Sequence, residues 1–69
     1  MADNDTNDTT HAIELHLVEA HALALAQFVK RVSWSEFRAN AVDDAEAYEI
    51  RAAVDALQRA LAEAGFAPR

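Results

Sequence analysis

The sequence predicts an all-α protein built on one antiparallel helical hairpin, and three observations lead to this prediction. The chain has a single Gly and a single Pro in 69 residues, and both lie close to its C-terminal end. Two helix-start patterns of the capping-box type occur in the middle of the chain. Apolar residues recur at spacings of three and four on either side of them. We therefore expect helices over about 10–32 and 44–64, joined by a short helix over about 34–40.

The first predicted helix begins at a hydroxyl cap, Thr10 or Thr9, and runs without Gly or Pro to about Val32. Lys30 and Arg31 fall in its last turn, where positive charge suits the carbonyl end of the helix dipole. Most of its large apolar residues form a stripe of about 160° when each residue turns the helix by 100°. These residues are Ile13, Leu17, Val18, Leu25, Phe28, Val29 and Val32.

This stripe is too wide for a single partner helix. Leu15 and Leu23 fall outside it, beside Ala22 and Ala26, so the helix is apolar nearly all round. A helix of this kind is typical of the middle of a larger bundle, and we predict that the chain assembles as a homodimer or tetramer. The candidate oligomer interface comprises Ile13, Leu17, Val18, His21, Leu25 and Phe28.

The short connecting helix is predicted from a complete start pattern. Ser33 is the expected N-cap, and the Glu36 side chain is expected to accept a hydrogen bond from the backbone N–H of Ser33. Val32 and Phe37 are the expected hydrophobic staple. The same pattern recurs ten residues later and starts the third helix. There Asp43 is the expected N-cap, Glu46 is the acidic residue of the capping box, and Val42 and Ala47 are the hydrophobic staple.

The third predicted helix has a narrow apolar seam and an opposite charged face. Gly65 is expected to end it in a left-handed conformation, with Phe66 folding back onto Leu61 and Pro68 preventing continuation. The seam residues, spaced 3, 4, 3, 4 and 3, are Ala47, Ile50, Val54, Leu57, Leu61 and Ala64. The charged face is formed by Arg51, Asp55, Arg59 and Glu63.

Composition limits the ways in which so small a chain can be stabilised. Residues 1–9 are polar and are expected to form a disordered tail, which leaves 10–69 as one helical domain with a marginal core. The absence of cysteine excludes disulfides and thiolate zinc sites, so self-association is the remaining route. The sequence shows no secretory leader and no apolar stretch near the roughly 20 residues of a membrane span. We expect a cytoplasmic protein.

The charge balance opposes direct binding to nucleic acid. The net charge is −6, and from His11 onward nine acidic and six basic side chains leave −3. The order of a short and a long helix also fits a DNA-binding helix-turn-helix protein. The second helix would then present acidic residues to the DNA phosphates, which opposes binding. These residues are Asp43, Asp44, Glu46 and Glu49, which are explained by capping and by the helix dipole.

No pattern in the sequence predicts catalysis or a cofactor. The chain lacks cysteine, a Gly-rich phosphate loop and an HExxH motif, so we expect a protein that is not an enzyme. His11, His16 and His21 are five residues apart, and on a helix they would point in three directions. Only His21 with Glu14 of two subunits could form a metal site, and we favour a structural histidine at the interface.

The aromatic residues are concentrated near the connecting helix. Trp34 and Phe37 are three residues apart there, beside Tyr48 of the next helix, and Arg38 adjoins them. They either close the end of the bundle or form an anchor for a partner protein. We take Trp34, Phe37, Arg38 and Tyr48 as the candidate protein-binding residues.

The last 43 residues resemble a small family of helical proteins found in proteobacteria and often encoded on mobile elements. The resemblance is carried by Gln27 to Arg31, by Phe37, Arg38 and Ala41, by Glu46 to Tyr48, and by Ala62 to Arg69. It implies no activity and no site residues. The resulting hypothesis is a non-enzymatic accessory protein that binds another protein as a homo-oligomer. The alternatives are an inhibitor of a host defence system, of the anti-CRISPR kind, and a metal-binding bundle.

Overall fold

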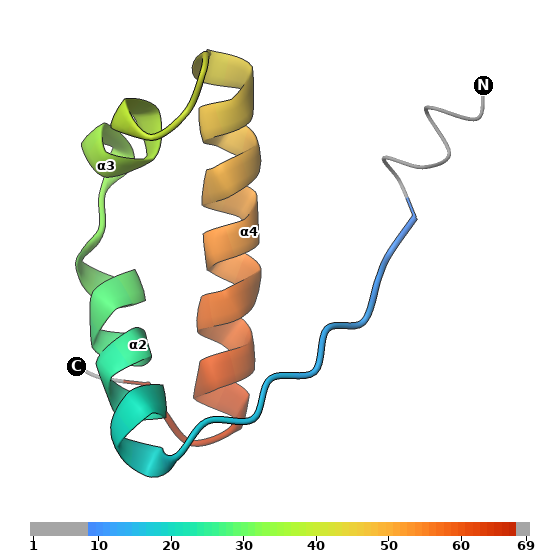
Figure 1. Cartoon of the computed structure of the whole chain (residues 1–69), viewed down its shortest axis with the longest axis vertical. Helices are drawn as coiled ribbons and strands as arrows, with labels where there is room; N and C mark the ends of the chain where they lie inside the picture. The colour runs from blue at the N-terminus through green and yellow to red at the C-terminus, as the bar shows by residue number, and fades with distance from the viewer. Residues whose placement is uncertain (1–8, 68–69) are drawn as a thin grey trace.

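The computed structural model describes residues 9–67 of the chain and is helical. Its helices are α2 (Glu19–Arg31), α3 (Trp34–Ala39) and α4 (Asp44–Glu63), and no strand occurs among the described residues. Figure 1 shows α2 and α3 following one another along one side of the hairpin, with α4 antiparallel to them along the other. α4 packs against both of the other helices. The predicted all-α hairpin with a short connecting helix is confirmed, whereas the predicted tail lies almost entirely outside the described residues.

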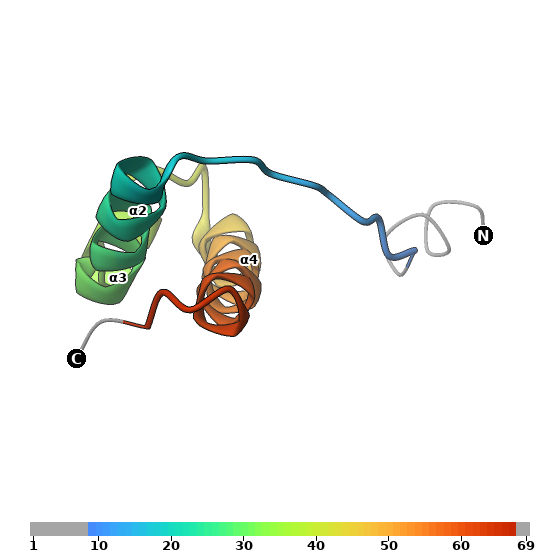
Figure 2. The same ribbon diagram turned by 90° about the horizontal axis from the view of Figure 1, so that it is seen from below.

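The start of the first helix differs from the prediction. The helix begins at Glu19 rather than near residue 10, and its N-cap, Val18, provides no side-chain hydrogen bond. Residues 9–18, which we call the N-terminal segment, are not helical. In Figures 1 and 2 this segment leaves the start of α2, crosses the lower end of α4 and continues beyond it. The predicted cap at Thr10 or Thr9 is therefore wrong.

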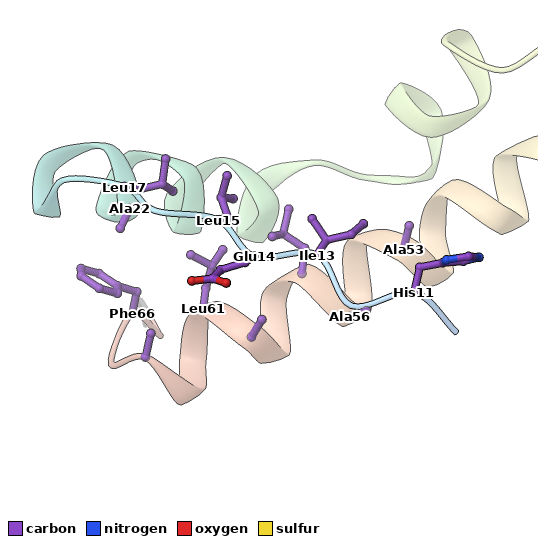
Figure 3. Close-up of a pocket in the computed structure, with 13 residues that line it drawn as sticks. His11, Ile13, Glu14, Leu15, Leu17, Ala22, Ala53, Ala56, Leu61 and Phe66 are labelled. Carbon is purple, nitrogen blue, oxygen red and sulfur yellow. The ribbon is translucent and has the colours of Figure 1, made fainter. Parts of the chain in front are cut away.

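The sequence of the N-terminal segment gives a physical reason for this difference. Ile13, Leu15 and Leu17 alternate with the polar residues Glu14 and His16. A period of two places alternate side chains on opposite sides of an extended backbone, whereas a helix would direct Leu15 away from Ile13 and Leu17. The extended form gathers all three apolar side chains together. In Figure 3 they lie on one side of the chain trace, and Glu14 lies on the other.

The two predicted start patterns of α3 and α4 are present. The Glu36 carboxylate accepts hydrogen bonds from the N–H of Ser33 at 2.7 Å and from its hydroxyl at 2.6 Å. Asp43 caps α4, because its Oδ1 accepts the N–H of Glu46 at 2.9 Å. The Glu46 carboxylate accepts a hydrogen bond from the N–H of Val42 at 2.7 Å, whereas a capping box would use the N–H of Asp43, one residue later. The predicted staple at this cap is wrong, since Val42 is 84% exposed.

The end of α4 is a Schellman motif, as predicted. Gly65 has a φ of 101°, which an L-residue adopts only at a cost. The N–H of Phe66 donates to the carbonyl oxygen of Leu61 at 2.8 Å, and the N–H of Gly65 donates to that of Ala62 at 3.0 Å. This turn brings the Phe66 side chain against the core cluster that contains Leu61.

The core between α2 and α4 is small and is made largely of alanine. The buried apolar residues among those described are Ala22, Ala26, Val29, Ala47 and Leu61. Ala26, Val29 and Leu61 form one core cluster. The partly buried residues that pack against it are Leu25, Val54, Leu57 and Phe66. The seam of α4 is thus confirmed as the packing face from Ala47 to Leu61, whereas Ala64, its last predicted member, follows the helix and is exposed. The predicted charged face is exposed.

The packing face of α2 is narrower than predicted and is centred elsewhere. Ala22 and Ala26, which we expected to lie beside the apolar stripe, face α4 and are 6% and 1% exposed. Small side chains allow the two helices to approach closely. As a result Phe28, which belongs to the predicted stripe, remains 61% exposed, and Leu23 remains 47% exposed.

Candidate interaction surfaces

The aromatic surface, which we define as Trp34 and Tyr48, lies where α3 meets α4. The two ring centroids are 4.7 Å apart and the ring planes are inclined by 44°. Trp34 is 38% exposed and Tyr48 is 60% exposed, so the pair is in contact and also accessible to solvent. Because the two rings come from different helices, their contact helps to fix α3 against α4.

The other two candidate protein-binding residues are less accessible. Phe37 is half-buried and lies on α3, which packs against α4. Arg38 is half-buried as well, and its guanidinium donates to Asp44 Oδ1 at 2.6 Å and to the carbonyl oxygen of Ala41 at 3.1 Å. Arg38 therefore braces the turn between α3 and α4. The structure brings Trp34 and Tyr48 together as a surface and places Phe37 and Arg38 mainly in its support.

One ionisable group near this surface has a shifted pKa. Hydrogen bonds from the Ser33 hydroxyl and the Ser33 N–H hold the pKa of the Glu36 carboxyl below its ordinary value. Glu36 itself is exposed to solvent, so the shift reflects the start of α3 rather than a catalytic environment.

The second surface is formed by the N-terminal segment and α4, and it includes an apolar pocket of about 690 Å³. In Figure 3 the segment runs beside α4, with His11 near Ala53 and Ala56 and with Leu17 near Ala22. The lining residues from the segment are His11, Ile13, Glu14, Leu15 and Leu17. Those from the helices and the C-terminal turn are Ala22, Ala53, Ala56, Leu57, Ala60, Leu61, Ala64 and Phe66.

The predicted oligomer-interface residues lie on two different parts of the structure, the N-terminal segment and α2. Ile13, Leu17 and Val18 lie on the N-terminal segment and are 86%, 38% and 63% exposed. His21 and Phe28 are exposed on α2, whereas Leu25 is partly buried against the core. Leu15, which is 58% exposed, belongs with the first group. Leu15 is absent from the predicted interface because on a helix it would point away from Ile13 and Leu17; the alternation of apolar and polar residues from Ile13 to Leu17 indicates the extended form.

Of the three histidines, His21 lies on a helix as predicted, whereas His11 and His16 lie on the non-helical N-terminal segment. Glu14 and His21 do not share a helix face, because Glu14 precedes the helix. Glu14 instead contacts His16, with Oε2 and Nε2 2.5 Å apart, and both side chains are exposed. Within residues 9–67 no group of three or more His, Asp or Glu side chains is arranged to hold a metal ion.

Two further features of the described residues bear on the kind of protein. No helix among them is long and apolar enough to span a membrane. The buried core contains no large side chain with less than 2% exposure, while nine large apolar side chains are exposed. The fold and its surfaces thus define a small helical hairpin protein with much of its apolar surface uncovered.

The chain belongs to a family of unknown function, DUF7706, whose model matches residues 1–69. No curated protein and no solved structure shows a significant match to the chain. The family assigns no activity, so the function has to be argued from the surfaces themselves.

Proposed function

We propose that this protein is a non-enzymatic interaction protein that works as a homo-oligomer and binds another protein through the aromatic surface. The observation that supports this most directly is the accessible contact between Trp34 and Tyr48, with ring centroids 4.7 Å apart. Aromatic side chains contribute much of the energy of protein interfaces because they bury a large area and have few rotatable bonds.

The setting of the aromatic surface favours binding over a purely structural role. A pair that only closed the end of the hairpin would be buried, whereas Tyr48 is 60% exposed. The backbone beneath the pair is fixed by the Ser33 and Glu36 cap and by the bond from Arg38 to Asp44. A surface that is ordered before binding loses less conformational entropy when a partner docks.

The cellular context is part of the same proposal. We place the protein in the bacterial cytoplasm and associate it with a mobile element, on the basis of its sequence resemblance and of the absence of cysteine. Self-association is supported by the small alanine-rich core and by the exposed apolar side chains.

A second candidate function is inhibition of a host defence enzyme by occupation of its nucleic-acid site. The net charge of −6 supports it through charge complementarity. However, the acidic residues at the start of α4 have local roles: Asp43 and Glu46 accept backbone N–H groups and Asp44 binds Arg38. Metal binding is supported less well, because Glu14 and His16 provide only a pair of ligands.

The test compares three purified full-length proteins as bait in a bacterial lysate, with captured proteins quantified by mass spectrometry. They are the wild type, Trp34→Ala, and the matched control Leu23→Ala, which removes an exposed apolar side chain from α2. We expect a specific partner that is retained by the wild type and the control and is lost with Trp34→Ala, while circular dichroism shows that the variant is folded. Equal capture by all three proteins would contradict the proposal.

Two additional measurements separate the alternatives. Capture that disappears between 0.1 and 0.5 M salt would favour the charge-based inhibitor, since exposed charges are screened at high ionic strength. Capture through aromatic side chains should persist at the higher salt concentration. Stoichiometric metal in the protein after purification and dialysis would favour the metal-binding bundle instead.

A further inference from the structure

Residues 10–17 of the N-terminal segment lack the backbone hydrogen bonds that a helix or a strand normally makes. From Thr10 to Leu17 no backbone N–H or C=O group has a hydrogen-bond partner in the described part of the chain. Three large apolar side chains of the same stretch are exposed, namely Ile13, Leu15 and Leu17, and the neighbouring Val18 is exposed as well. An extended segment that combines unpaired backbone groups with exposed apolar side chains is a template for pairing with another strand.

We propose that this strand is the same segment of a second copy of the chain, paired antiparallel, with Leu15 of the two copies opposite each other at the two-fold axis. The proposal deepens the proposed function, because it rests on a homo-oligomer and names the element that forms it. In such a pair an interface patch on one copy meets the same patch on the other, as two-fold symmetry requires.

The sequence of the segment selects this register over the others. Residues directly opposite each other in an antiparallel pair lie on the same face of the sheet. Ile13, Leu15 and Leu17 all have odd numbers, so they lie opposite one another only in registers in which the numbers of opposite residues add up to an even sum. With Leu15 opposite itself, Ile13 lies opposite Leu17 on one face. On the other face Glu14 lies opposite His16 of the second copy.

The neighbouring even registers are disfavoured by charge. A shift in one direction places Glu14 opposite Glu14 of the second copy, and like charges directly opposite each other destabilise a strand pair. A shift in the other direction places His16 opposite His16 and leaves both Glu14 side chains without a histidine opposite. Only the register centred on Leu15 matches the apolar face and the polar face together.

The geometry of a single copy is compatible with this pairing. Glu14 and His16 already contact each other at 2.5 Å and are both exposed, so they share a face and can reach the complementary pair of another copy. Ile13, Leu15 and Leu17 line the apolar pocket beside α4, as Figure 3 shows. Pairing would supply about six to eight backbone hydrogen bonds and would cover apolar side chains that one copy leaves exposed.

The direct test uses single cysteines in the full-length protein, which has none of its own. In Leu15→Cys the two sulfur atoms would lie opposite each other at the two-fold axis, within the range of a disulfide. In the matched control Leu17→Cys the two residues would be four positions out of register, about 13 Å apart, which is too far. We expect a disulfide-linked dimer under mild oxidation for Leu15→Cys, and at least tenfold less for Leu17→Cys.

A charge exchange tests the register independently. Glu14→Arg and His16→Glu should each weaken the dimer, measured as at least a tenfold rise in its dissociation constant by analytical ultracentrifugation. The double variant should restore it, because the opposite charges then face each other again. Leu23→Lys, on the exposed surface of α2, should leave the constant unchanged.

Three results would overturn the inference. These are a monomer at all concentrations with no disulfide in Leu15→Cys, equal cross-linking of Leu15→Cys and Leu17→Cys, and a dimer that cross-links through Phe28→Cys on α2 but not through Leu15→Cys. The last result would leave the proposed function intact and would show that helices form the interface. The capture experiment with Trp34→Ala concerns a different surface, on α3. If that experiment finds no partner, the cross-linking test of the N-terminal segment is unaffected.

Discussion

Phe66 and Leu61 are joined twice at the end of α4: the N–H of Phe66 donates to the Leu61 carbonyl oxygen at 2.8 Å, and both side chains belong to the core region between α2 and α4. The residue that makes this return possible is Gly65, with its φ of 101°. Apart from Gly65 and its two chain neighbours, no atom of residues 9–67 lies within 4 Å of the position that a Cβ would take there, so a substitution at Gly65 changes the backbone energy and meets no steric obstacle.

Replacement of Gly65 by Ala should therefore destabilise the protein by about 1 to 2 kcal/mol, the cost of holding an L-residue in the left-handed region. Gly65→Asn should lose less, because Asn tolerates this region better than Ala. Thermal unfolding followed by circular dichroism measures both variants. Equal stability of the wild type and Gly65→Ala would show that the chain does not end α4 in this way.

Glu36 should stabilise the protein in a pH-dependent manner. Its pKa in the folded state is lowered by the hydrogen bonds from Ser33, so its contribution is present above the ordinary pKa of 4.5 and is lost as the pH falls through the folded value. Glu36→Gln should lower the melting temperature at pH 7, and the difference from the wild type should shrink toward pH 3.

The matched control for Glu36 is Glu49→Gln. Glu49 lies on α4 with an exposed side chain, and that side chain makes no hydrogen bond or ion pair in the described part of the chain, so this change should leave the pH dependence of the melting temperature almost unaltered. If the difference between the wild type and Glu36→Gln were constant from pH 7 to pH 3, the cap at Ser33 would not depend on the charge of Glu36.

Trp34 and Tyr48 should stabilise each other in the free protein. Trp34→Ala and Tyr48→Ala should each leave the domain folded, because both side chains are partly exposed. The double variant should lose less stability than the sum of the two single variants, with a coupling energy of about 0.5 to 1.5 kcal/mol, as measured for aromatic pairs. Chemical denaturation of the four proteins gives this value. A coupling near zero would mean that the two rings do not contact each other in solution.

The parts of the fold that depend on local sequence were predictable. The caps at Ser33 and Asp43 and the ending at Gly65 each require a few residues at fixed spacing, and the structure contains all three. The helix bounds that follow from them are correct to within one or two residues for α3 and α4.

The start of the first helix was not predictable in the same way, because two periodicities compete there. Ile13 and Leu17 fit a helix of period 3.6, and the same residues with Leu15 fit an extended chain of period two. Capping favoured the wrong alternative, because Thr9 and Thr10 offer a hydroxyl cap whereas Val18, the N-cap in the structure, has no side-chain oxygen. The predicted interface depended on the same assumption of a helix, which is why Leu15 was left out of it; His21 lies on α2, and its place in the interface stays a prediction.

The packing face of α2 was missed for a different reason. Apolar patterns give weight to large side chains, whereas this helix packs through alanines, and Ala26 is 1% exposed against Val29 and Leu61. The short distance between α2 and α4 requires a small residue at position 26, and this distance cannot be derived from the pattern of apolar residues in the sequence. The structure therefore predicts that the size of the side chain at this position matters more than its hydrophobicity.

Ala26→Leu tests this prediction directly. The added atoms have no space between α2 and α4, so the helices must separate or the side chain must adopt a strained rotamer, at a cost of about 1 to 3 kcal/mol. Ala24→Leu is the matched control, because it makes the same change two residues earlier at an exposed position of the same helix. Both variants gain the same hydrophobicity and lose the same small amount of helix propensity, because Ala is the best helix former, so only packing distinguishes them. We expect a clear fall in the midpoint of chemical denaturation for Ala26→Leu and little change for Ala24→Leu; the reverse order would mean that α2 presents its other face to α4.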